Sequence, residues 1–268
     1  MNEPDWMAPA SLDEALALRA EHGGDATVLA GGTFVGILMN QGFLAPRALL
    51  SLQHVHELRA IEERDGELRL GAMATHRAVE RSALVRDRWP ALAGAFALVA
   101  SPRVRNQATV GGVLADADYA SDPPAMLAAL GARAVLRSPR GEREVSIGEL
   151  ILGYYETCIA PDELLTEVRV PPQPERAVYR KFRSRSSEDR PCAAVAAVRG
   201  EDGLRVVVGA VADTPQEFPD VCETDDPGAV AAGYAERIEP LADSRGSAAY
   251  RRRVIAAEVR RAVEAVSA

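Results

Sequence analysis

The sequence has few cysteines and no metal-binding pattern among them. Its three cysteines, Cys158, Cys192 and Cys222, are far apart, and no two form a Cys-x-x-Cys pair. This spacing encodes neither a disulfide framework nor a zinc or iron–sulfur site. We therefore expect no metal on this chain and a reducing, cytoplasmic setting.

Long apolar runs and an excess of basic charge are also absent. No uninterrupted apolar run approaches the roughly 18 residues that a membrane helix needs, and no charged start leads into an apolar core, so we expect no membrane insertion. The 268 residues include 39 acidic and 31 basic side chains, and the net charge of -8 would repel nucleic acid. The composition, 47% hydrophobic and 26% charged, fits one large domain or two modest ones.

The motifs of several common enzyme classes are missing as well. Neither Gly-x-Ser-x-Gly nor His-Glu-x-x-His occurs, and the pair His54 and His56 has no glutamate beside it in a metal motif. Gly36 is not followed by the Lys and Ser or Thr of a P-loop, and the Rossmann Gly-x-Gly-x-x-Gly is absent. We predict no catalytic side chain here, so a bound dinucleotide would itself perform the chemistry.

Two glycine pairs dominate what the sequence does contain. Gly31-Gly32 lies between a predicted strand and a predicted short helix, and Gly111-Gly112 lies before a predicted helix start at Ser121. Glycines permit positive φ and let a ligand approach bare backbone N–H groups, although one such pair alone would indicate only a tight turn. Two pairs, each beside a helix start, predict one shared diphosphate site.

The polar side chains near these loops are mostly neutral. Thr33, Thr109 and Ser121 suit a diphosphate held by many N–H and O–H donors. Asp122 would repel a phosphate, so we expect it to accept hydrogen bonds from sugar or ribityl hydroxyl groups. The alternative for Asp122 is a helix-start carboxylate favoured by the helix dipole.

The remaining pattern predicts an α+β chain in two parts. Strands are predicted at residues 27–30, 49–52, 164–170, 178–183, 193–199 and 204–212, with hairpins over 58–70 and 133–146. Helices are predicted at residues 12–22, starting from a capping box at Ser11, and at 34–41, 75–82, 89–100, 121–131, 147–152, 229–238 and 248–266. Pro171, Pro172 and Pro174 mark a linker, and a separate α+β unit follows it.

Five motifs in order resemble the FAD-binding subunit of the molybdenum hydroxylases, the family of xanthine dehydrogenase and carbon monoxide dehydrogenase medium subunits. They are Ala30-Gly31-Gly32-Thr33, Arg105-Asn106 with Thr109-Val110-Gly111-Gly112, Ala120-Ser121-Asp122, Tyr179-x-Lys181-Phe182 and Arg245-Gly246-Ser247-x-x-Tyr250-Arg251. The resemblance spans nearly the whole chain. It implies a two-part FAD-binding domain of the vanillyl-alcohol-oxidase (PCMH) type over residues 1–172, with subdomains of about 1–55 and 56–172. It also implies a C-terminal carbon monoxide dehydrogenase flavoprotein-like domain over residues 173–268, with a three-stranded antiparallel sheet and three helices.

The resemblance also implies the residues that contact FAD. They are Leu29, Ala30, Gly31, Gly32, Thr33, Phe34, Val35 and Gly36 in the first loop, Thr109, Val110, Gly111, Gly112 and Val113 in the second, and Val99, Ala100, Ser121, Asp122, Leu165 and Lys181 elsewhere. Val99 and Ala100 match the segment that backs the flavin, and Leu165 and Lys181 match positions that reach the ring region. Val113 replaces a common asparagine, and Asp116 stands where histidine is frequent. Because neither change removes a backbone donor, we expect FAD binding to survive, weakened by the loss of the asparagine contact.

The implied function is electron relay. A large partner subunit with a molybdenum cofactor hydroxylates the substrate, and a small subunit with two-iron iron–sulfur clusters passes on single electrons. FAD on this chain then delivers electron pairs to NAD+, oxygen or a quinone. Two alternatives stay open at this point: a stand-alone flavin-dependent oxidoreductase of the same fold, and an assembly subunit that has lost its cofactor.

Overall fold

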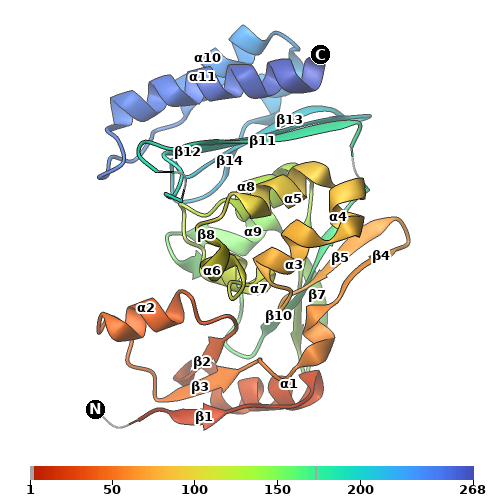
Figure 1. The fold of residues 1–268 in the computed structure, drawn as a ribbon, viewed down its shortest axis with the longest axis vertical. Coiled ribbons are helices and arrows are strands. Elements are labelled where there is room, and N and C mark those ends of the chain that lie inside the picture. The colour runs from red at the N-terminus through yellow and green to blue at the C-terminus, as the bar shows by residue number, and fades with distance from the viewer. Residues whose placement is uncertain (1–2, 173, 187) are drawn as a thin grey trace.

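Residues 3–172, 174–186 and 188–268 are described by the structure, a computed structural model. They form three units stacked along the long axis of the molecule (Figure 1). A small parallel sheet lies at the N-terminal end, a five-stranded antiparallel sheet covered by helices lies in the middle, and a four-stranded antiparallel sheet beneath two helices lies at the other end. This arrangement confirms the predicted α+β class.

The N-terminal unit is a three-stranded parallel sheet in the order β1-β3-β2. Its elements are β1 (Asp5–Met7), α1 (Leu12–His22), a 3-10 turn (Gly23–Asp25), β2 (Ala26–Leu29), α2 (Val35–Asn40), β3 (Ala48–Ser51) and a second 3-10 turn (His56–Arg59). Ser11 caps α1 by accepting a hydrogen bond from the Glu14 amide, as predicted. The predicted capping box is incomplete, because the Glu14 carboxylate accepts from the Ala10 amide rather than from the Ser11 amide.

The middle unit is built on an antiparallel sheet in the order β4-β5-β10-β6-β7. Its strands are β4 (Ile61–Arg64), β5 (Glu67–Gly71), β6 (Arg133–Ser138), β7 (Gly141–Ser146) and β10 (Leu164–Val170). Asp65 and Gly66 have φ of 56° and 83° in the turn between β4 and β5, which is the geometry that a two-residue hairpin loop favours. Both predicted hairpins are therefore present.

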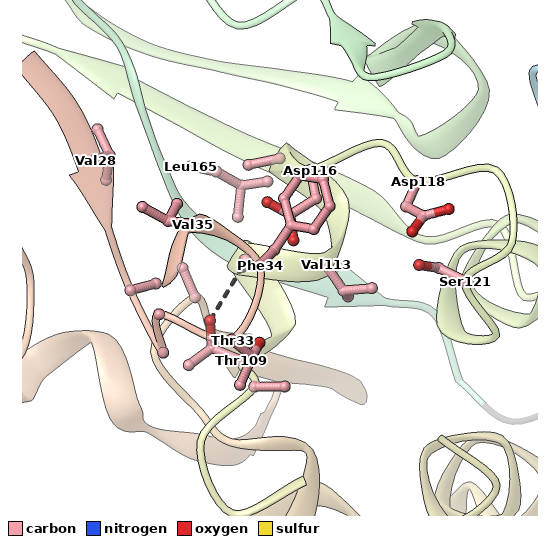
Figure 2. Close-up of a pocket in the computed structure, with 18 of the residues that line it drawn as sticks. Val28, Thr33, Phe34, Val35, Thr109, Val113, Asp116, Asp118, Ser121 and Leu165 are labelled. Atoms are coloured by element: carbon pink, nitrogen blue, oxygen red, sulfur yellow. Dashed lines mark hydrogen bonds between the residues drawn. The ribbon is translucent and has the colours of Figure 1, made fainter. Parts of the chain in front are cut away.

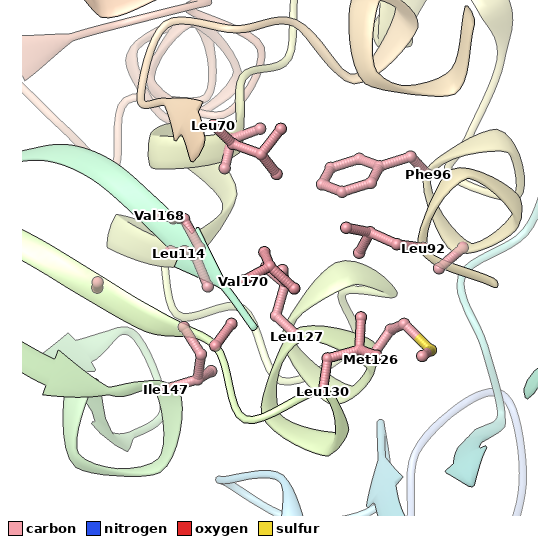
Figure 3. Close-up of a cluster of buried hydrophobic side chains, with 14 of the residues drawn as sticks. Leu70, Leu92, Phe96, Leu114, Met126, Leu127, Leu130, Ile147, Val168 and Val170 are labelled. Carbon is pink, nitrogen blue, oxygen red and sulfur yellow. The ribbon is translucent and has the colours of Figure 1, made fainter. Parts of the chain in front are cut away.

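Short helices cover one face of this sheet and bury the largest hydrophobic cluster of the molecule. They are α3 (His76–Arg81), α4 (Ala83–Arg88), α5 (Pro90–Ala97), α6 (Pro102–Arg105), α7 (Val110–Ala115), α8 (Pro123–Ala129) and α9 (Ile147–Leu150), followed by the small hairpin β8 (Ile151–Gly153) and β9 (Glu156–Thr157). Leu70, Val168 and Val170 of the sheet face Phe96 of α5 and Leu127 of α8 in this cluster (Figure 3). Burial of these side chains fixes α5, α7 and α8 at one end of the sheet, where the glycine loops lie.

Two local predictions in this unit are wrong. The predicted helix over residues 147–152 ends at Leu150, because the chain turns there into β8. Ser121 does not cap α8: the residue before its first turn is Asp122, whose carboxylate binds other side chains instead of the helix amides.

The C-terminal unit is an antiparallel sheet in the order β11-β12-β13-β14. Its elements are β11 (Arg176–Phe182), β12 (Ala193–Gly200), β13 (Gly203–Gly209), β14 (Gln216–Glu217), a 3-10 turn (Pro219–Glu223), α10 (Pro227–Arg237) and α11 (Ala248–Ser267). The three predicted strands and two predicted helices are present, and β14 adds a two-residue edge strand. Arg251 of α11 is fully buried and donates to the carbonyls of Cys192 and Ala210 at 2.6 and 2.5 Å. This motif arginine therefore ties α11 to the sheet rather than facing the glycine loops.

Candidate functional site

A cavity of about 720 Å³ opens between the N-terminal and middle units and reaches the edge of the C-terminal sheet. Both glycine loops line it, together with residues of β10, β11 and the loop between β11 and β12. Figure 2 shows side chains of the two glycine loops and of β10 directed into one space. Its volume is within the range of roughly 300 to 1,000 Å³ that ligand sites occupy.

The first glycine loop connects the end of β2 to the start of α2. A Cβ atom on Gly31 would lie 1.8 Å from the Gln107 carbonyl oxygen, so this glycine lets the segment before the second loop cross at close range. Gly32 has φ of 71°, a left-handed conformation that glycine adopts without strain. The two glycines therefore serve different purposes: Gly31 brings the loops together, and Gly32 turns the backbone toward the cavity.

The backbone amides of the first loop are available for a ligand. Within the part of the chain that the structure describes, no N–H group from Gly31 to Val35 donates to a protein acceptor. Regular pairing resumes at Gly36, whose amide donates to the Gly32 carbonyl at 2.9 Å. Five successive free N–H groups at the edge of a cavity form an anion-binding surface.

The second glycine loop differs from its prediction, because Gly111 and Gly112 lie in the first turn of α7, which Thr109 caps, and not in an open loop. Three of its amides are used inside the protein: Val110 donates to Ala74, Gly111 donates to Ala72, and Gly112 donates to the Thr109 hydroxyl at 3.0 Å, the bond drawn in Figure 2. The expectation of bare amides is therefore wrong for this loop. This loop contributes space to the cavity, because Gly112 has no side chain. A Cβ atom added to Gly112 would lie 3.9 Å from the Cβ atom of Ala30 in the first loop. The two loops are thus adjacent, as the sequence predicted.

A buried ion pair closes the end of the cavity near α8. The Lys181 ammonium lies 2.8 Å from the Asp122 carboxylate, and the side chains are 1% and 4% exposed. Tyr179 donates to the other Asp122 oxygen at 2.8 Å, and Lys181 also donates to the Leu98 carbonyl. Burial raises the pKa of Asp122, and the Lys181 charge opposes that shift. Asp122 is therefore a neutralised, fixed acceptor rather than a free carboxylate.

The turn formed by Val99 and Ala100 lies beside this pair. Ala100 has φ of 38°, which is unusual for a residue with a side chain. Arg105, nearly buried, holds the turn by donating to the Val99 and Ala100 carbonyls at 2.8 and 2.9 Å, while its Nε contacts Glu80 at 2.8 Å. Arg105 thus fixes the conformation of Val99 and Ala100, which line the cavity.

The predicted contact residues are not all in the cavity, and they do not lie together. Leu29, Gly36 and Val110 are not among its lining residues, and the Val110 side chain is fully buried in the hydrophobic core. Leu165 lies near Val28 and Val35, on the opposite side of Phe34 from Ser121 (Figure 2). Leu165 lies on β10 of the middle unit and Lys181 on β11 of the C-terminal sheet, so these two predicted positions come from different units.

Many lining residues were not predicted, and three of them show why: nothing in the local sequence distinguishes Tyr155, Glu188 or Arg190. Tyr155 follows β8 with φ of 57°, and its ring stacks on Phe34 at 5.6 Å between centroids. Glu188 and Arg190 reach the cavity from the loop between β11 and β12, and Arg190 forms an ion pair with Asp118. Only the packing of the C-terminal sheet against the middle unit brings this loop to the site.

Comparison with known proteins supports one family. Residues 2–173 match the family described as the FAD binding domain in molybdopterin dehydrogenase. The chain belongs to this family. No helix in the described residues combines the length and apolar character needed to cross a membrane.

Members of this family resemble the chain over almost its whole length. The 6-hydroxypseudooxynicotine dehydrogenase complex subunit alpha of Paenarthrobacter nicotinovorans is 32% identical over 272 residues, covering 96% of this chain and 92% of that protein. The carbon monoxide dehydrogenase medium chain of Hydrogenophaga pseudoflava is 33% identical, with coverages of 97% and 96%. Among solved structures, the cyanide-inactivated Cu,Mo-CO dehydrogenase has a chain with a TM-score of 0.93 and 30% identity, with coverages of 99% and 98%. These relatives are flavoprotein subunits of oxidoreductases.

The cavity fits the FAD that the family implies. FAD carries a central diphosphate, and the lining of the 720 Å³ cavity includes residues 31–35 with their free amides. The site lacks a Cβ atom at Gly32 and Gly112, which leaves room for a ligand to approach the backbone. The neutralised Asp122 leaves no unpaired negative charge at the α8 end of the site.

Proposed function

We propose that this chain is the FAD-binding electron-transfer subunit of a molybdenum-containing hydroxylase or dehydrogenase. In this proposal it receives electrons from an iron–sulfur subunit and passes them to NAD+, oxygen or a quinone. The family match, the relatives that are named as medium chains or complex subunits, and the cavity lined by both glycine pairs support it. When bound, FAD supplies the ability to accept electrons singly and release them in pairs.

The single observation that carries the proposal is the set of unpaired amides at the first loop, opposite the second loop. In this arrangement the amides of residues 31–35 hold the diphosphate without a cationic side chain. Asp122, fixed by Tyr179 and Lys181, presents its remaining lone pairs to hydroxyl groups of the cofactor.

The other predicted positions complete the proposed contact set. Phe34, Val113 and Leu165 line the cavity with apolar surface, and Val99 and Ala100 form a wall beside Lys181. The remaining proposed contacts are Leu29, Ala30, Val35, Gly36, Thr109, Val110, Gly111 and Ser121. Leu29, Gly36 and Val110 belong to this proposed set by their positions in the matched loops, although none of the three lines the cavity.

We further propose that residues 1–172 form the FAD-binding domain and residues 173–268 the second domain. The segment between β10 and β11 contains the prolines at the proposed boundary. The molybdenum cofactor and the two-iron clusters would lie on a large and a small partner subunit, and the complex would operate in the cytoplasm. This division fits a chain whose cysteines do not form a cluster-binding pattern.

Cofactor binding can be tested on the isolated chain. Purified protein, incubated with FAD and desalted, is expected to retain a flavin absorbance spectrum in a one-to-one ratio. The absence of a bound chromophore after this incubation would contradict the proposal and favour an assembly subunit.

Electron transfer requires the complex. Co-purification with the partner subunits, followed by metal analysis, is expected to yield molybdenum and iron with the flavin. Reduction of the flavin on addition of substrate to the complex, but not to the isolated chain, would support the relay. Turnover by the isolated chain would instead favour a stand-alone flavin oxidoreductase.

A further inference from the structure

An unpaired acidic side chain lies in the cavity one helical turn beyond the second glycine pair. Gly112, Val113 and Asp116 all line the cavity, and residues three and four apart share one face of a helix (Figure 2). Within the described chain, the Asp116 carboxylate accepts no hydrogen bond and forms no ion pair; its backbone amide donates to Gly112. A carboxylate therefore lies in the cavity that the proposed function assigns to FAD, at the end of the helix that carries Gly112.

The nearby charges do not neutralise Asp116. Asp118, almost fully buried, forms an ion pair with Arg190 and accepts a hydrogen bond from the Ala120 amide at 3.0 Å. Glu188, which is exposed, adds another negative charge to the cavity rim. Arg190 is thus the cation of this region, and it is already paired with Asp118.

The other titratable groups lining the cavity have partners of their own. Lys181 is paired with Asp122, as described above. Arg19 donates to the carbonyls of Gly23, Ala26 and Glu163, and the Glu163 carboxylate is paired with Arg143. Burial lowers the pKa of His76 to about 4, so this ring is neutral near pH 7. None of these groups offers a compensating charge to Asp116.

The surroundings of Asp116 favour its protonated form. Burial raises the pKa of Asp116 to about 7, with a further contribution from the Asp118 carboxylate and opposition from Arg190. A diphosphate in the same cavity would disfavour the charged carboxylate further, because like charges repel strongly where water is scarce. The protonated acid would instead provide an O–H donor for a phosphate oxygen.

We propose that Asp116 couples cofactor binding to proton uptake, so that the site takes FAD together with one proton from solvent. This inference rests on the proposed function and assigns Asp116 as a determinant of cofactor affinity. It gives the site a property that its neutral amide and hydroxyl donors do not provide: affinity that depends on pH near neutrality.

The test measures the dissociation constant of FAD for the full chain from about pH 6 to about pH 9. Above about pH 7 the constant is expected to increase with pH, approaching tenfold per pH unit if one full proton is taken up. Calorimetry in buffers of different ionisation enthalpy is expected to report the same proton uptake. Asp116→Asn is expected to bind FAD with little dependence on pH and more tightly than the wild type at high pH.

The matched control is Asp87→Asn, which removes an equal charge from an exposed position on α4. It is expected to keep the wild-type pH dependence. The inference is overturned if the wild-type dissociation constant does not change across this range, or if Asp116→Asn keeps the wild-type slope.

A second measurement needs no variant. Carbon-13 NMR of the Asp116 carboxyl group is expected to show its titration midpoint moving upward when FAD binds, and an unchanged midpoint would overturn the inference. Failure to bind FAD at any pH would overturn the proposed function as well. Binding that does not depend on pH would overturn only the role of Asp116.

Discussion

Replacing Gly32 with valine tests whether the left-handed turn of the first loop is needed to hold FAD. A Cβ atom at this position would meet only Leu29 Cδ1, at an ordinary 3.5 Å, so the Cβ atom itself introduces no collision. The perturbation is conformational: φ of 71° is strained for a β-branched residue. We expect the loop to relax and turn its amides out of the cavity.

The structure provides a control with the same strain and no contact with the cavity. Gly42 has φ of 76°, no atom within 4 Å of an added Cβ, and no place among the lining residues. A left-handed residue with a side chain costs about 1–3 kcal/mol. Gly32→Val and Gly42→Val should therefore lose similar stability, and a protein of this size would melt about 2–4 °C lower per kcal/mol.

The two variants should differ in cofactor binding. Each protein is incubated with FAD and desalted, and the flavin retained per chain is measured by absorbance alongside the thermal unfolding of the apoprotein. Gly42→Val is expected to retain flavin as the wild type does, whereas Gly32→Val is expected to lose it. Equal flavin content in the two variants would refute the role given to the first loop.

Three other substitutions or conditions probe the walls of the cavity. Lys181→Met leaves the buried Asp122 carboxylate unpaired, so urea unfolding should show a loss of about 3–5 kcal/mol; a loss near zero would contradict the ion pair. Gly31→Ala sets a methyl group 1.8 Å from a backbone carbonyl, so we expect a marked fall in melting temperature, and wild-type melting would show that the loops do not cross as described. His76 has its pKa lowered from 6.5 to about 4, chiefly by burial, so its neutral form stabilises the fold above pH 6.5. That stability, up to about 3 kcal/mol, should be lost as the pH falls from 6.5 to about 4, and His76→Gln should show a smaller loss over the same range.

Much of the fold could be predicted from the sequence because its signals are local. Ser11 and Thr75 cap helices where their spacing indicates, and the turn at Asp65 and Gly66 joins two strands as predicted. These caps and turns depend on residues only a few positions apart, so they can be predicted without knowledge of the tertiary fold. The incorrect cap at Ser121 has the opposite origin, because the conformation there is set by contacts of Asp122 with distant side chains.

The candidate site could be predicted only in outline. The sequence indicated that two glycine loops would share one space, and they do. It did not reveal that the amides of Gly111 and Gly112 donate hydrogen bonds to Ala72 and Thr109. The free amides that could bind a ligand are therefore those of the first loop. The fate of each backbone amide depends on which acceptor the fold brings near it.

By itself, the sequence determined the longer helices and strands, the two hairpins, the two glycine pairs and the lack of clustered cysteines, but not short elements such as β1, α6, α7 and β14. The tertiary structure alone decided how charge is distributed in the cavity. It paired Asp122 with Lys181 and Asp118 with Arg190 across separations of dozens of residues, and it left Asp116 without a partner. The physical reason is that an ion pair in a poorly solvated site depends on distances of a few ångströms, and those distances are set by how the C-terminal sheet packs against the middle unit.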